Sequence, residues 1–208
     1  MKRLIALFQL VVFTFLLSCD SSNKPSSTSA GSGALETIPA AAEVIDLGSI
    51  EKVMVKDAQG RIVEEGNALN GLKEGAWITY NEDGVPTTLT NYHKGVKLGV
   101  ELTFDNNASL STKSYQNGDN IEGEFRKYQN RNLSEIKTYE NGILNGPHLT
   151  FYTNEKVQQE VNYVNGNFDG LARWFSQDGK LTIAYVYDDG ELVDKNPNLS
   201  AQDSVASY

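Results

Sequence analysis

A glycine recurs every 23 or 24 residues between positions 71 and 190, and this period restricts the fold more than any other feature of the chain. The series is Gly71, Gly95, Gly118, Gly142, Gly166 and Gly190. A second glycine follows each of the first five, at Gly75, Gly99, Gly123, Gly146 and Gly170. Aromatic residues keep the same period at Tyr80, Phe104, Tyr128, Phe151 and Phe175, and again at Tyr92, Tyr115, Tyr139, Tyr163 and Tyr187. Self-similarity at this length predicts a repeat array in which each unit contacts mainly its neighbours.

Each unit carries two turn signals and is too short for a helix and two strands. One signal is a dipeptide such as Asn70-Gly71, in which both residues tolerate the positive φ of a tight hairpin turn. The other signal lies about halfway along the unit, as in residues 81–84. Two short strands per unit predict an all-β fold, a continuous antiparallel meander of repeated hairpins.

Period-2 alternation in the first strand of each unit separates two faces. The predicted core face carries Ala76, Ile78 and Tyr80; Val100, Leu102 and Phe104; Pro147, Leu149 and Phe151; and Leu171, Arg173 and Phe175. The other face is part polar and part aromatic, and we expect it to be solvated with isolated hydrophobic platforms. Its candidate binding residues are Trp77, Phe125, His148 and Trp174.

The third unit departs from this pattern. It places Glu124 and Arg126 on the predicted core face and has one extra residue between Gly118 and Gly123. Either a bulge shifts its register or this unit is the least stable. Pro147 cannot donate to a strand ladder, so we expect it at the start of a strand.

The tyrosine column has two interpretations. Tyr92, Tyr115, Tyr139, Tyr163 and Tyr187 should lie on successive hairpins about 10 Å apart, where they would brace neighbouring units by cross-strand packing. The alternative is a row of stacking platforms for a sugar polymer or an extended peptide.

The N-terminus has the features of an export signal. Lys2 and Arg3 precede an apolar run from Leu4 to Leu17, which is shorter than the roughly 20 residues of a membrane span. The sequence Leu16-Leu17-Ser18-Cys19 resembles the bacterial lipobox, which implies cleavage before Cys19 and lipidation of its thiol. A plain secretory signal with a chance cysteine is the alternative. Because Cys19 is the only cysteine, the chain cannot form an internal disulfide.

Composition divides the chain into four parts. We predict a signal peptide over 1–18, a lipidated Cys19 with a flexible Ser/Ala/Gly linker over 19–45, a repeat domain over 46–193, and a polar tail over 194–208. Loss of residues 1–18 would leave 16 basic residues against 27 acidic ones, a net charge of −11. So acidic a chain repels nucleic acid, and we expect it to meet the membrane through the lipid anchor only.

The repeat resembles the MORN repeat in its bacterial variant, with the pattern G-x-x-x-G-x-W-x-x-Y, over residues 51–192. Glu101, Phe125, His148 and Ala172 depart from it at the position of Trp77. The resemblance implies an elongated, curved, single-layer sheet used for recognition or scaffolding. Many bacterial members are labelled as antitoxins, so an antitoxin-like neutraliser of a partner protein is one alternative function.

No catalytic or metal-binding set can be assembled from the sequence. His93 and His148 are 55 residues apart, and neither stands beside a candidate nucleophile. We therefore expect a non-catalytic protein without a cofactor or metal.

The sequence favours a lipid-anchored protein of the bacterial cell envelope that binds an envelope protein through its repeat array. Carbohydrate binding through exposed aromatic platforms is the second hypothesis. Asp20 resembles the inner-membrane retention signal of enteric bacteria, but that rule does not hold in every phylum, and we prefer the outer membrane.

Overall fold

The structure, a computed structural model, describes residues 33–195, and all of its regular structure is β-strand. The signal peptide, Cys19 and the residues after 195 lie outside the described part. No helix in the described part is long and apolar enough to cross a membrane. The strands are β1 (Glu43–Asp46), β2 (Glu51–Lys56), β3 (Ile62–Leu69), β4 (Leu72–Tyr80), β5 (Pro86–His93), β6 (Val96–Phe104), β7 (Leu110–Asn117), β8 (Asn120–Ile121), β9 (Gly123–Gln129), β10 (Asn132–Glu140), β11 (Ile143–Phe151), β12 (Val157–Val164), β13 (Asn167–Phe168), β14 (Gly170–Phe175), β15 (Leu181–Asp188) and β16 (Glu191–Lys195).

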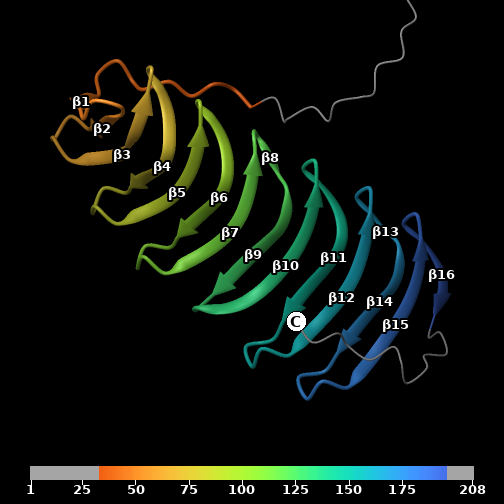
Figure 1. Cartoon of the computed structure of the whole chain (residues 1–208). Coiled ribbons are helices and arrows are strands. Elements are labelled where there is room, and N and C mark those ends of the chain that lie inside the picture. Colours follow the sequence, from red (N-terminus) through yellow and green to blue (C-terminus); the bar gives the residue numbers. More distant parts are fainter. Residues whose placement is uncertain (1–32, 196–208) are drawn as a thin grey trace, which may run out of the picture.

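The strands form one antiparallel sheet in which sequence neighbours are also spatial neighbours. Figure 1 shows bowed strands that follow one another along a single axis, with β1 and β16 at opposite ends. The short strands β8 and β13 pair with β7 and β12 and continue into β9 and β14. This arrangement confirms the predicted all-β fold, a single-layer meander of hairpins.

The first turn of each unit is a two-residue hairpin turn. At Asn70-Gly71 both residues have positive φ, 54° and 75°, which is the type I′ geometry that suits the twist of the strands. The pairs at 94–95, 141–142, 165–166 and 189–190 behave in the same way.

The third unit turns one residue later than predicted. Asn117 pairs with Asn120, so the turn residues are Gly118 and Asp119, and of these two only Gly118 has positive φ. That pattern fits a type II′ turn. Because a slip of one residue reverses the two faces, Tyr115 leaves the tyrosine column and Gln116 replaces it. The prediction that Tyr115 belongs to the column was therefore wrong.

The second glycine of each unit lies at a β-bulge. Near Gly99, Thr90 pairs with Glu101 and Tyr92 pairs with Lys97. The segment of β6 between these pairs is two residues longer than the facing segment of β5. Gly75, Gly99, Gly123, Gly146 and Gly170 all have positive φ. Pro147 directly follows such a bulge in the middle of β11 rather than starting a strand, which corrects our expectation. The interrupted ladder there tolerates its missing N–H.

Side chains are buried on both faces of the sheet. We call the side with Trp77, Tyr92, Tyr139, Tyr163 and Tyr187 the ring face, and the other side the opposite face. Trp77, Val161 and Ala172 are buried on the ring face, and Ile136, Leu149 and Phe175 on the opposite face. The prediction of one core face and one solvated face was therefore wrong. Ala76 and Pro147, which we placed in the core, are exposed where each follows a bulge glycine.

The N-terminal segment from residue 33 is not a free linker. Residues 33–42, which we call the strap, cross the hairpin ends of the first units, and β1 then pairs with β2. Figure 1 shows this segment running across the ends of β4 and β6. The predicted flexible linker over 19–45 was wrong for residues 33–45, because main-chain hydrogen bonds and apolar contacts hold them in place.

Candidate functional site

The strap is bound to the repeat array as an extended peptide. The N–H of Ile38 donates to the carbonyl of Gly71 (3.1 Å), and the N–H of Glu36 donates to the carbonyl of Gly95 (2.7 Å). The carbonyl of Glu36 accepts from the N–H of Lys73 (3.1 Å). Two main-chain groups of one strap residue are therefore satisfied at the contact between two neighbouring hairpins.

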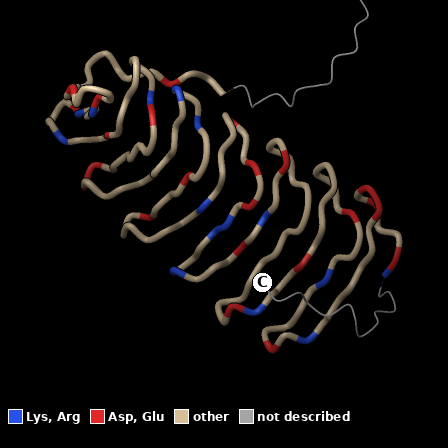
Figure 2. The backbone as a smooth tube through the Cα atoms, viewed as in Figure 1, with Lys and Arg blue, Asp and Glu red and all other residues tan. Residues whose placement is uncertain are grey.

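The side chain of Glu36 enters a cluster that we call the Lys73 cage. The Lys73 ammonium lies 2.9 Å from Glu36 and 2.6 Å from Glu64, and the lysine is only 6% exposed. It also lies over the rings of Trp77 and Tyr92, 4.5 and 5.0 Å from their centroids. The Tyr92 hydroxyl donates to Glu36 (3.0 Å). Figure 2 shows acidic and basic positions meeting where the strap crosses the hairpin ends.

The cage shifts the titration of its members. Burial raises the pKa of the Glu36 carboxyl, but the hydrogen bond and positive charge of Lys73 outweigh burial and hold it below its usual range. Burial, and then the nearby Glu36 carboxylate, raise the pKa of Tyr92 far above its usual value. At neutral pH the cage therefore holds ionised Glu36 and a protonated tyrosine.

Trp77 is buried beneath this cluster, and so it is not the exposed platform that we predicted. Its side chain is 1% exposed, and its indole N–H donates to the carbonyl of Asn67 (2.7 Å). Room for the ring comes from Gly66 on β3, where an added Cβ would lie 2.4 Å from Cδ2 of Trp77. Val53, Ala68 and Tyr92 pack around it, with Ile38 and Ala42 against them. A glycan cannot stack on this ring.

The other predicted platforms are half-buried and packed against tyrosines. Phe125 meets Tyr139 edge-on at 6.4 Å, and His148 lies 5.9 Å from Tyr163. Trp174 contacts Tyr185 at 5.6 Å. These contacts are those expected of rings that brace neighbouring strands.

In the last hairpins the rings form a continuous row. Tyr163 and Phe168 lie 4.8 Å apart, and Phe168 and Tyr187 lie 5.2 Å apart. Phe168 was not among the predicted site residues. It lies two places after a turn glycine, Gly166, and that spacing could have identified it.

His148 is also held by a charged pair on the same face. Its Nε2 lies 2.8 Å from Glu135, which also contacts Lys137 at 2.9 Å. Burial lowers the pKa of His148, and the Glu135 carboxylate opposes this only in part. His93 lies at the end of β5 beside Glu74, 3.0 Å away, and is exposed.

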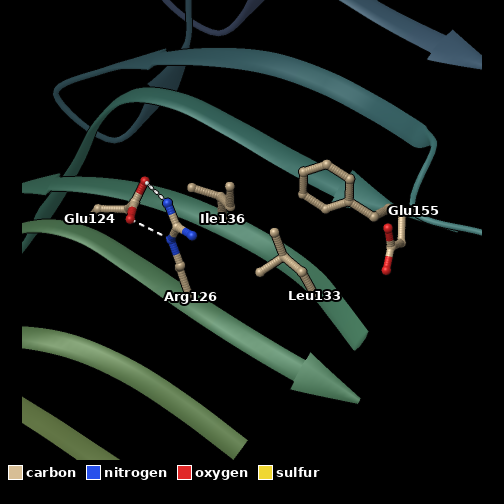
Figure 3. A pocket seen from close by; sticks show the side chains of 6 residues that line it. Glu124, Arg126, Leu133, Ile136 and Glu155 are labelled. Atoms are coloured by element: carbon tan, nitrogen blue, oxygen red, sulfur yellow. Dashed lines mark hydrogen bonds and ion pairs between the residues drawn. The ribbon is translucent and has the colours of Figure 1, made fainter. Parts of the chain in front are cut away.

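A pocket of about 420 Å³ opens on the opposite face at the irregular third unit. Arg126 stays on this face, paired with Lys113, because the extra residue of the unit is absorbed at the turn. Figure 3 shows Glu124 and Arg126 bonded to each other beside Leu133 and Ile136. Three other units place Ile78, Leu102 or Leu149 at the position of Arg126, and the fifth unit places Arg173 there. The pocket thus has an apolar floor and a charged rim whose central ion pair is already formed.

Acidic residues directly before the bulge glycines accept hydrogen bonds from the turn of the next hairpin. The sequence analysis did not predict this role. Glu74 accepts from the N–H of Lys94 (2.8 Å), and Glu122 accepts from the N–H of Asn141 (2.9 Å). Asp169 accepts a hydrogen bond from the N–H of Asp189 (3.4 Å). The signal was an acid directly before Gly75, Gly123 and Gly170.

A scan of protein-family models and a search of curated proteins found no match to this chain. Its function is therefore inferred from the residues of the chain itself.

Proposed function

We propose that this chain is a non-catalytic, lipid-anchored protein of the bacterial cell envelope whose MORN-like repeat array binds a partner protein through its ring face. The anchor is Cys19, on the lipobox-like sequence that precedes it. Acyl chains on this residue would hold the protein at a membrane.

The observation that carries the proposal is the bound strap. The array already holds an extended peptide across its hairpin ends, through main-chain hydrogen bonds, an ionic contact at Lys73 and apolar contacts to Ile38. Backbone pairing of an extended segment at the margin of a sheet is a common mode of peptide recognition. A repeat array presents the same geometry many times, which suits it to binding proteins.

Charged groups on the ring face support a binding role over a catalytic one. Lys73 is neutralised by two carboxylates, and Glu135 is shared between Lys137 and His148. Groups that are already paired in this way stabilise the sheet.

Site-specific photo-crosslinking in cells of the source bacterium tests the proposal. A photoreactive residue replaces Lys127, exposed on the ring face, or Tyr115, exposed on the opposite face. We expect a discrete protein adduct from position 127 and none from position 115. The Cys19→Ser chain should leave the membrane fraction and lose the adduct. If position 127 gives no adduct, ring-face protein binding is wrong.

A further inference from the structure

The contact that receives Glu36 is part of a repeated main-chain pattern. Beneath the strap, the N–H of Gly95 donates to the carbonyl of Lys73 (2.9 Å) and ties one hairpin to the next. We call this pair of residues a junction. Glu36 bridges it by accepting from the N–H of Lys73 and donating to the carbonyl of Gly95.

The same junction bond recurs along the array. Each later turn glycine donates to the corresponding residue of the hairpin before it: Gly118 to Lys97 (2.9 Å), Gly142 to Ile121 (3.1 Å), Gly166 to Leu144 (2.8 Å) and Gly190 to Phe168 (2.8 Å). Within residues 33–195 the strap reaches only as far as Gly118, where an added Cβ on Gly33 would lie 2.8 Å from Cα of Gly118. In the described part, the strap hydrogen-bonds across the Lys73–Gly95 junction and leaves the last two uncovered.

The side chains at the junctions change character along the array. The first two present Lys73 and Lys97 on the ring face, and Lys73 binds the acidic side chain of the strap. The later ones present Ile121, Leu144 and Phe168 at the same position. An acidic side chain placed there would lose its ionic partner and be desolvated among rings.

The last two junctions lie beside the continuous row of rings. Leu144 pairs across its hairpin with Tyr139, and Phe168 packs between Tyr163 and Tyr187. All of these residues are half-buried, so part of each stays accessible to solvent. Apolar side chains from a bound segment would cover that surface and gain free energy by its burial.

We propose that the Leu144–Gly166 and Phe168–Gly190 junctions bind an extended segment of a partner protein in the backbone mode of the strap. One residue of the segment bridges each junction with its N–H and carbonyl. The side chains of these bridging residues are apolar or aromatic and pack on Leu144 with its neighbour Tyr139 and on the row from Tyr163 to Tyr187. This inference rests on the proposed protein-binding function and adds to it the location, backbone geometry and side-chain class of the partner.

Synthetic peptides with the sequence of the strap test the inference. The probe is a fluorescent peptide of residues 33–42 in which Glu36→Phe places a ring at the inward position, and the matched control is the unchanged peptide. Both are titrated to millimolar concentration into the mature chain. We expect the Glu36→Phe peptide to bind at least tenfold more tightly than the control peptide.

Two neighbouring substitutions locate the binding. Leu144→Asp places a charge on the ring face, and Ile143→Asp places one on the other side of the same hairpin, where the side chain is 53% exposed. Only Leu144→Asp should weaken binding, by at least tenfold, with unchanged circular dichroism in both variants. If Leu144→Asp unfolds the chain, a competition experiment tests the inference instead. An excess of the Glu36→Phe peptide should displace the partner protein and abolish the photo-crosslinked adduct from position 127.

Three results overturn the inference: no binding of the Glu36→Phe peptide, equal binding of the two peptides, or equal effects of the two substitutions. If the adduct from position 127 then persists in Leu144→Asp, the array binds protein elsewhere and the proposed function stands. Absence of any ring-face adduct instead contradicts the proposed function itself.

Discussion

Lys73 shows how one buried charge can fasten a separate segment to a sheet. An unpaired ammonium in this position would be costly to desolvate, and Glu64 from β3 and Glu36 from the strap both compensate it. Trp77 and Tyr92 complete the enclosure with their ring faces. The position of the strap is therefore coupled to the ionisation of one carboxyl group.

We predict that Glu36→Gln destabilises the chain at neutral pH by about 1–2 kcal/mol, because a charged hydrogen bond becomes a neutral one. The pKa of Glu36 is lower in the folded chain than in the unfolded chain. Its contribution is therefore present above the unfolded value of about 4.3 and is lost as pH falls through the folded value. Urea unfolding of both chains at neutral and acidic pH should show a gap that closes in acid.

The matched control is Glu43→Gln, which removes an exposed ion pair with Lys56. Exposed ion pairs contribute little to stability, so the free energy of unfolding of this variant should differ from that of the parent by under about 1 kcal/mol at every pH. A gap for Glu36→Gln that persists unchanged in acid would contradict the role assigned to its charge.

Each hairpin depends on a few left-handed residues whose neighbours cap the turn. The second turn of a unit lies at the other end of the strands from the Asn-Gly turn. In one such turn, Asp57 Oδ1 accepts from the N–H groups of Gln59 and Arg61, and Asn81 and Asp105 repeat this pattern. Gly60, Gly84 and Gly179 then take the positive φ. Ala108 occupies the same place with φ of 57°. An alanine there is strained where a glycine would not be.

We predict that Ala108→Gly stabilises the chain by about 1 kcal/mol, although glycine usually destabilises β structure. The reciprocal change Gly84→Ala should destabilise it by a similar amount. An added Cβ at Gly84 meets no atom within 4 Å, so its cost comes from the backbone alone. Chemical unfolding measures both, and a loss of stability in Ala108→Gly would refute the assignment of strain to Ala108.

The turns also show where sequence reasoning succeeded and failed. The Asn-Gly and Lys-Gly dipeptides correctly predicted hairpins, because their residues accept the φ that type I′ turns need. Asn117-Gly118 gives the same signal, yet the extra residue before Gly123 moves the turn to Gly118-Asp119. The dipeptide alone cannot show this slip, and so Tyr115 was placed on the wrong face.

The molecule is a single layer, and this explains the remaining errors. Local alternation identified two faces correctly but not which was buried, because each face buries some side chains against neighbouring hairpins. The Lys73 cage joins residues 37 positions apart, and the strap, composed mostly of small residues, gave no sign of it. The aromatic periods did indicate Tyr163 and Tyr187 of the row of rings, but not Phe168 between them.

The strap covers the first end of the array, and we predict that a chain beginning at Glu43 loses stability there first. Its removal uncovers Trp77 and Tyr92 and takes one carboxylate from Lys73. In a Trp174→Phe background, emission from Trp77 should shift to longer wavelength. Hydrogen exchange should accelerate in β2 to β5 and stay unchanged in β10 to β14, since hairpins contact mainly their neighbours. Uniform acceleration would contradict this.

The junction bond has a consequence for the length of the array. From the β3–β4 hairpin onward, each hairpin joins the next through the same glycine contact, so a whole unit could be added or removed and the contact formed again. The strap meets successive turns at Ile38 and Glu36, and Gly33 lies against the turn after these, so each added unit would accommodate two or three more residues of a bound segment. Under the proposed binding mode, the number of hairpins would then set the length of the extended segment that the array can hold.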